Sequence, residues 1–154
     1  MELLDLINEN LIVTGLEASN KEETIKKLID MLEKEERLIS REKFFEDVLF
    51  REQLCSTYVG QGVAIPHGKT DAVKKTSVAI GKLAKPIEWD EKENNYVNIV
   101  FLLAVQDKDA DNQHLRILAN IATKLMEKDF IDNLTSINDK DGILALFRED
   151  TKEL

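Results

Sequence analysis

His67 and His114 are the only two histidines of the 154-residue chain, and each stands where a side chain could meet a ligand. His67 follows a short apolar run, 63–65, and Pro66. Because proline has no backbone donor and a fixed φ, we expect Pro66 to end the strand and place the imidazole at its end, where open α/β sheets gather ligands. Gly68 lacks a Cβ, which lets a partner or an anion approach the backbone. By themselves, these residues indicate nothing more specific than a histidine that fills a turn.

His114 lies in the segment KDADNQHLRILANIATKL. With Asp111 as the N-cap, it stands in the first turn of a helix, where free N–H groups and partial positive charge favour a phosphate. The same field disfavours an imidazolium, so we expect a neutral His114 that donates one N–H. Two strands of one sheet can bring the following loops together, so His67 and His114 could meet. A helix-end histidine that contacts only water is an equally common alternative.

Two neutral imidazoles suit phosphoryl transfer. One ring nitrogen attacks phosphorus and forms a reactive phosphoramidate, while the other ring hydrogen-bonds the transferred group. In-line transfer depends mainly on positioning and charge neutralisation, so a nearby guanidinium would help. Arg51 is the candidate, although a cation near a helix C-terminus is also favourable by itself.

Two other kinds of site would use the same histidines. Cys55 and His67 could form a thiol nucleophile and its base, but no third residue that would orient the base is evident. A metal-dependent hydrolase would need acidic ligands beside the histidines, and neither HExxH nor HxH spacing is present. The candidate acidic ligands are Asp71, Asp107, Asp109 and Asp111. We therefore expect no metal, and without a P-loop or a GxGxxG motif we expect no bound nucleotide.

The composition is that of a soluble globular protein, with 43 % hydrophobic and 33 % charged residues. The net charge of −9 disfavours nucleic acid and anionic lipid as partners and would steer a basic protein partner. The single cysteine fits a reducing compartment. No apolar run approaches the about 20 residues of a membrane span, and the N-terminus has no basic region typical of a signal peptide. We therefore expect a cytoplasmic protein.

Hydrophobic periodicity predicts helices interleaved with strands. The strand 98–105 is almost continuously apolar, which indicates burial on both faces and therefore helices on both sides of the sheet. The expected fold is an α/β sandwich of three layers that forms one domain over residues 1–154. Trp89 is expected to be a partly buried anchor in a loop. The other expected elements are helices at 20–35, from Ser40 to Leu54, from Asp111 to Met126, at 130–134 and at 139–148, and extended segments at 11–16, 63–65 and 77–83.

The segments REQLCSTYVGQGVAIPHG and NIVFLLAVQDKDADNQHLRILANIATKL resemble enzyme IIA of the fructose–mannitol class of the bacterial phosphoenolpyruvate-dependent sugar phosphotransferase system. The shared pattern is an Arg-Glu pair, a Ser-Thr step before glycines, Ala-Ile-Pro-His, and an Asn-x-His-Leu that opens a helix after an apolar strand. The resemblance extends over essentially the whole chain. It implies a mixed sheet flanked by helices, and it favours the two-histidine site over its alternatives.

The resemblance also implies roles for the matched residues. His67 would accept a phosphoryl group from the phosphocarrier protein HPr and pass it to a cysteine of enzyme IIB, which serves sugar uptake through the membrane component IIC. His114 would stabilise the phosphohistidine, and Arg51 would neutralise phosphoryl oxygens or hold the loop. Thr57 and Gly68 match positions near the site. Because the donor is a protein phosphohistidine, no cofactor is expected.

Nitrogen-type relatives offer a second function. They keep the phosphorylatable histidine but act as regulators by binding other proteins. The sugar stays open, since parts of the sequence are similar to mannitol-type members and others to fructose-type members.

Overall fold

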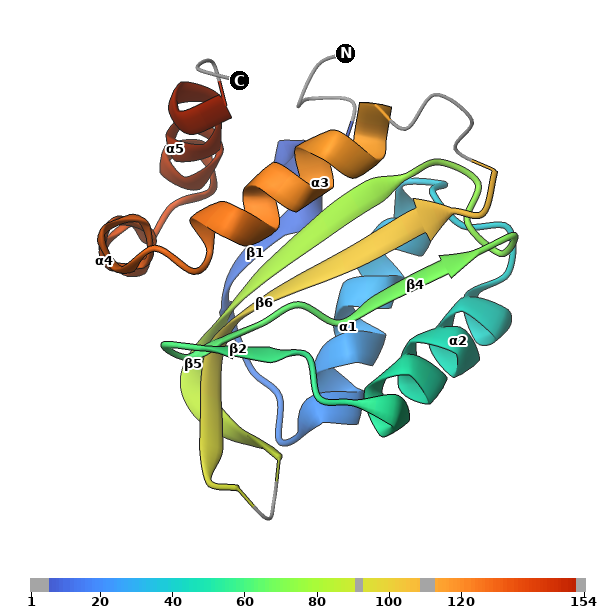
Figure 1. Cartoon of the computed structure of the whole chain (residues 1–154), viewed down its shortest axis with the longest axis horizontal. Coiled ribbons are helices and arrows are strands. Elements are labelled where there is room, and N and C mark those ends of the chain that lie inside the picture. The colour runs from blue at the N-terminus through green and yellow to red at the C-terminus, as the bar shows by residue number, and fades with distance from the viewer. Residues whose placement is uncertain (1–5, 91–92, 109–112, 152–154) are drawn as a thin grey trace.

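A six-stranded mixed sheet separates two layers of helices (Figure 1). The computed structural model describes residues 6–90, 93–108 and 113–151. The strand order is β1-β5-β6-β3-β2, and β4 also pairs with β6. β5 and β6 are antiparallel, whereas β1 runs parallel to β5, and β3 and β4 run parallel to β6. The strands are β1 (Ile12–Leu16), β2 (Tyr58–Gly60), β3 (Val63–Ala64), β4 (His67–Thr70), β5 (Ser77–Asp90) and β6 (Asn95–Gln106).

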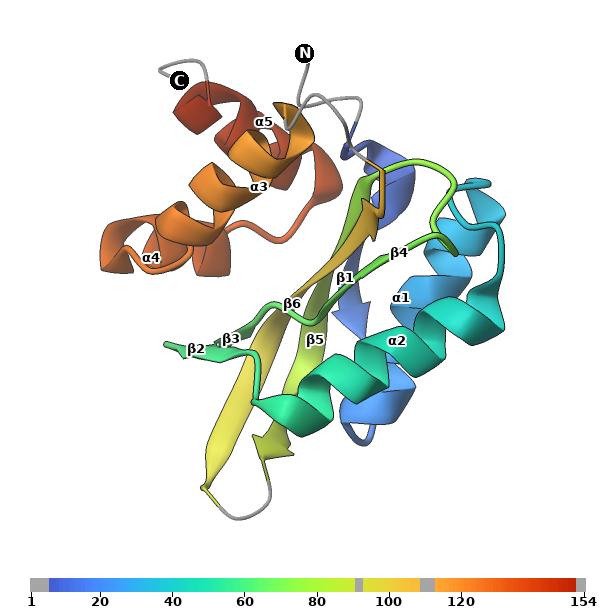
Figure 2. The same ribbon diagram turned by 45° about the vertical axis from the view of Figure 1, so that its right-hand side comes forward.

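The helices cover both faces of this sheet. Figure 2 shows α1 and α2 on one side, and α3, α4 and α5 on the other. This arrangement confirms the predicted three-layer α/β sandwich. The helices are α1 (Lys21–Lys34), α2 (Arg41–Leu54), α3 (Gln113–Lys124), α4 (Lys128–Ser136) and α5 (Lys140–Thr151), and a 3-10 turn, η2 (Glu9–Leu11), precedes β1.

The central strand β6 supplies apolar side chains to both layers. Since successive side chains of a strand point to opposite faces, Ile99 and Phe101 join the core under α3–α5. Val100 and Leu102 join the core under α1 and α2. All four are almost completely buried. The near-continuous apolar sequence of this strand follows directly from its two covered faces.

Side-chain caps start the two helices of the α1–α2 layer where the sequence predicts them. The Asn20 side chain accepts the N–H of Glu23 at 2.9 Å, and the Ser40 hydroxyl accepts the N–H of Lys43 at 3.2 Å. α2 then runs beside β4, with Phe44 and Val48 buried in the core beneath it. This packing fixes the position of the last turn of α2 next to the start of β4.

The structure corrects two local predictions. Pro66 does not end the strand pairing, because its carbonyl accepts the N–H of Leu103 at 2.9 Å and His67 already pairs with Leu103 in β4. Trp89 lies in β5 and is buried rather than in a loop, since β5 continues past Leu83 to Asp90. The register of the pairing between β5 and β6 shifts between Lys82 and Ile87. This stretch contains a proline, which has no N–H to donate to the neighbouring strand.

Candidate functional site

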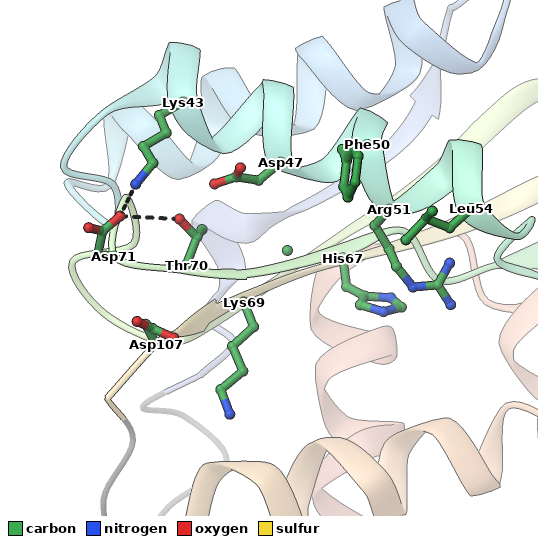
Figure 3. Close-up of a pocket in the computed structure, with 11 residues that line it drawn as sticks. Lys43, Asp47, Phe50, Arg51, Leu54, His67, Lys69, Thr70, Asp71 and Asp107 are labelled. Atoms are coloured by element: carbon green, nitrogen blue, oxygen red, sulfur yellow. Dashed lines mark hydrogen bonds and ion pairs between the residues drawn. The ribbon is translucent and has the colours of Figure 1, made fainter.

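Of the predicted site residues, Arg51, His67 and Gly68 line a groove of about 730 Å³ between α2 and β4 (Figure 3). One face of α2 forms its wall, with side chains at the spacing of successive helical turns. All four residues of β4 line the other side. The lining residues are Lys43, Asp47, Phe50, Arg51, Leu54, His67, Gly68, Lys69, Thr70, Asp71 and Asp107.

His67 is half-buried at the start of β4, and a backbone carbonyl fixes its ring. Its Nδ1 lies 2.9 Å from the carbonyl oxygen of Ile65. Because a carbonyl oxygen can only accept, Nδ1 must carry the proton in this arrangement. In the neutral ring, the lone pair is then on Nε2, which is the nitrogen left for nucleophilic attack.

Arg51 lines the same groove from the last turn of α2. Its Nη1 donates to the carbonyl of Cys55 at 2.7 Å and so satisfies one carbonyl at the end of the helix. A guanidinium has five N–H donors, so this bond leaves others that could reach an anion in the groove. The helix-end and anion-binding interpretations of Arg51 are therefore compatible.

Gly68 and Thr57 contribute to packing and to loop position. A Cβ at Gly68 would lie 3.2 Å from both Phe44 Cε1 and Val48 Cγ2, so a larger residue there would force these α2 side chains to shift. Thr57 is buried and is not among the groove-lining residues. Its hydroxyl donates to Glu52, and its carbonyl accepts the N–H of Ile65 at 3.0 Å. Thr57 thus contacts the residue whose carbonyl holds His67.

The far end of the groove is charged. Lys43 and Asp71 form an ion pair, and this contact raises the pKa of Lys43 and lowers that of Asp71. One carboxylate oxygen of Asp47 is buried without a hydrogen-bond partner in the described part of the chain. Four groove-lining residues of α2 were not predicted as site residues: Lys43, Asp47, Phe50 and Leu54. These residues recur every three or four positions, which places them on one face of the helix. This spacing is the sequence signal that could have indicated a common surface.

The structure gives only part of the predicted arrangement around His114. His114 is the second residue of α3, as the helical periodicity predicts, but its side chain and Asp111 lie outside the described residues. The meeting of the two imidazoles therefore stays a prediction.

The alternative sites gain no support from the described residues. Cys55 is exposed and does not line the groove that holds His67. Within residues 6–90, 93–108 and 113–151, no group of three or more His, Cys, Asp or Glu side chains is arranged to hold a metal ion. Asp109 and Asp111 are not described.

No helix in the described ranges is long and apolar enough to cross a membrane.

Comparison with known families agrees with the resemblance. The family model for the phosphoenolpyruvate-dependent sugar phosphotransferase system, EIIA 2, matches residues 5–150. The chain therefore belongs to this family of phosphocarrier domains, which take part in phosphotransfer.

Both sugar-specific phosphotransferase components and a nitrogen regulatory protein are similar to the chain. A fructose-specific EIIABC component of Bacillus subtilis is 28 % identical over 99 % of this chain, which spans only 24 % of that protein's length. The structure of the nitrogen regulatory protein IIA-Ntr of Neisseria meningitidis matches with a TM-score of 0.83 and 29 % identity, covering 95 % of this chain and 99 % of that one. A complex of mannitol enzyme IIA and phosphorylated enzyme IIB of Escherichia coli matches with a TM-score of 0.78 and 25 % identity, over 93 % and 97 % of the two chains.

Proposed function

We propose that this chain carries a phosphoryl group on Nε2 of His67, taking it from phospho-HPr and passing it to a cysteine of enzyme IIB. The observation that carries the proposal is the 2.9 Å contact between Nδ1 of His67 and the Ile65 carbonyl, because in the neutral ring the lone pair is then on Nε2, beside the groove. The complex of a related IIA with phosphorylated IIB supports IIB as the acceptor. The sugar served by the onward transfer would be fructose-like or mannitol-like.

The transfer step needs no group beyond the donor and this chain. As the Nε2–P bond of His67 forms, the N–P bond of the donor phosphohistidine breaks, and the donor imidazole leaves with that electron pair. The His67 ring becomes positively charged, and the Ile65 carbonyl accepts from its Nδ1–H. Arg51 would neutralise phosphoryl oxygens from the groove wall, and His114 would donate an N–H to the group.

Two further residues near the site have supporting roles in this proposal. Thr57 holds the segment that carries Ile65, and Gly68 lets α2 approach β4 closely enough to form the groove. Residues 1–154 would act as one phosphocarrier domain.

Labelling tests the proposal. Incubation with enzyme I, HPr and ³²P-labelled phosphoenolpyruvate is expected to place one acid-labile phosphate on the protein, and His67→Ala should abolish it. Arg51→Lys keeps the positive charge but loses the fork-shaped donor set, so we expect slower labelling at the same site. An unlabelled wild-type protein would contradict the proposal.

A nitrogen-type regulator is the second candidate function. The match to IIA-Ntr of Neisseria meningitidis, over nearly the whole of both chains, favours it. Adding the cognate IIB and IIC to the labelled protein separates the two: a carrier passes the phosphate to sugar, whereas a regulator keeps it.

A further inference from the structure

Lys21 and Glu52 form an ion pair in which the carboxylate is buried and the lysine side chain is 22 % exposed. Glu52 follows Arg51 in α2 but faces the interior, and only 3 % of its side chain is exposed. Its carboxylate lies 3.1 Å from Nζ of Lys21 and accepts the hydroxyl hydrogen of Thr57. Taking a carboxylate out of water is costly, and a buried pair is often no more stabilising than well-packed apolar residues. The burial of Glu52 is therefore weak evidence for a purely stabilising role.

Consecutive hydrogen bonds connect this carboxylate to the nucleophile. Glu52 accepts from the Thr57 side chain, and the carbonyl of Thr57 accepts the N–H of Ile65 at 3.0 Å. The carbonyl of Ile65 in turn lies 2.9 Å from Nδ1 of His67. The direction of the Ile65 carbonyl, and so the tautomer of His67, depends on where Thr57 is held.

A second carboxylate holds the same segment from the other side. Asp90, at the end of β5, accepts the hydroxyl hydrogen of Ser56 at 2.5 Å and lies 3.4 Å from Nζ of Lys21. Burial alone would raise the pKa of Asp90, but the bonds from Ser56 and Asn95, together with Lys21, keep it below its usual value. Lys21 thus joins the two carboxylates that hold residues 56 and 57.

We propose that Glu52, paired with Lys21, is a positioning residue that keeps the proton of His67 on Nδ1 by fixing Thr57 and Ile65. Glu52 does not line the groove and touches no reacting group, so it acts only through these neighbours. The proposal rests on the phosphoryl transfer proposed for His67, but the tautomer itself can be measured in the resting protein.

The test compares two variants with two matched controls. Glu52→Gln removes the charge that faces Lys21, and Thr57→Val removes the hydroxyl at nearly constant volume. Thr57→Ser keeps the hydroxyl, and Glu46→Gln makes the same chemical change at an exposed position of α2. Circular dichroism establishes whether each variant is folded. If Glu52→Gln does not fold, the measurements on Thr57→Val decide whether the proposal holds.

Two readouts separate positioning from general structural damage. The ¹⁵N spectrum of the His67 ring in the unphosphorylated protein should show the proton on Nδ1 in the wild type and both controls. It should show a mixture of tautomers in Glu52→Gln and Thr57→Val. The maximal rate of phosphorylation by phospho-HPr should fall about 10- to 100-fold in these two variants, with the half-saturating donor concentration unchanged. The controls should stay within about twofold of the wild type.

Folded variants that keep the wild-type tautomer would overturn the proposal, whether or not their rates change. A fall in rate explained by weaker donor binding would also overturn it. If the wild type accepts no phosphate, the proposed function fails, while the ¹⁵N spectra still decide whether Glu52 positions His67.

Discussion

At the scale of the residue, the proposed attack by Nε2 of His67 rests on one backbone carbonyl. The Ile65 oxygen can only accept, so in the neutral ring it favours the Nδ1–H form of His67, with the lone pair on Nε2. The neighbouring residues have separable tasks: in the proposed function Arg51 would offer donors to an anion, whereas Gly68 leaves room for the α2 side chains.

Gly68→Ala tests the packing role at this scale. The added Cβ would lie 3.2 Å from Phe44 and Val48, so these side chains must shift by a few tenths of an ångström. We expect the free energy of unfolding to fall by about 1–2 kcal/mol, measured by urea denaturation. In a Val48→Ala background, the cost of Gly68→Ala should be smaller because one contact is gone. Equal costs in both backgrounds would mean that the contact with Val48 is not the cause.

The sequence indicates a class of chemistry, but it does not indicate the surroundings of single residues. The resemblance carried by the two histidine segments implies phosphoryl transfer, whereas the ring nitrogen that is free depends on the carbonyl of Ile65 in three dimensions. Glu52 belongs to the Arg-Glu pair of the shared pattern, but the sequence does not indicate that its side chain is buried, because a glutamate in a helix is usually exposed. Its partner Lys21 belongs to another helix and meets it only in the folded chain.

At the scale of the element, the predicted helices and the most apolar strand are confirmed because their periodicity reflects local burial. β4 could not be predicted from composition, since its four residues, His67–Thr70, show no apolar alternation. They form a strand because the backbone on both sides of Pro66 pairs with β6. The stretch of β5 beyond Leu83 was missed because a proline there ordinarily argues against a strand.

Lys82→Met tests a contact between two elements. Lys82 is buried on β5, and its ammonium donates to the carbonyls of Leu134, Thr135 and Ile137 at 2.5–3.1 Å, near the end of α4. The variant removes these donors at similar volume and leaves the carbonyls without them. We therefore expect the free energy of unfolding to fall by about 1–3 kcal/mol relative to the wild type. Thermal and urea denaturation measure the change. Lys85→Met, at an exposed position of the same strand, is the control and should have little effect; equal losses in both variants would contradict the role of these bonds.

At the scale of the whole molecule, the three layers follow from two apolar cores on opposite faces of one sheet. The sequence indicates that such a sheet exists, because 98–105 is apolar on both faces. It does not specify the strand order β1-β5-β6-β3-β2, which depends on pairing between distant segments. This order places β4 and the last turn of α2 side by side, and so forms the groove that contains His67 and Arg51.

The most direct test of this account is to locate the phosphate on the protein labelled by phospho-HPr. A ³¹P–¹⁵N correlation spectrum of the protein with ¹⁵N-labelled histidine identifies the nitrogen bonded to phosphorus. Spectra of the His67→Ala and His114→Ala variants assign the ring signals to the two histidines. We expect coupling from phosphorus to Nε2 of His67 and to no other ring nitrogen. A phosphate on Nδ1 of His67, or on His114, would contradict the claim that the Ile65 carbonyl selects the nucleophile.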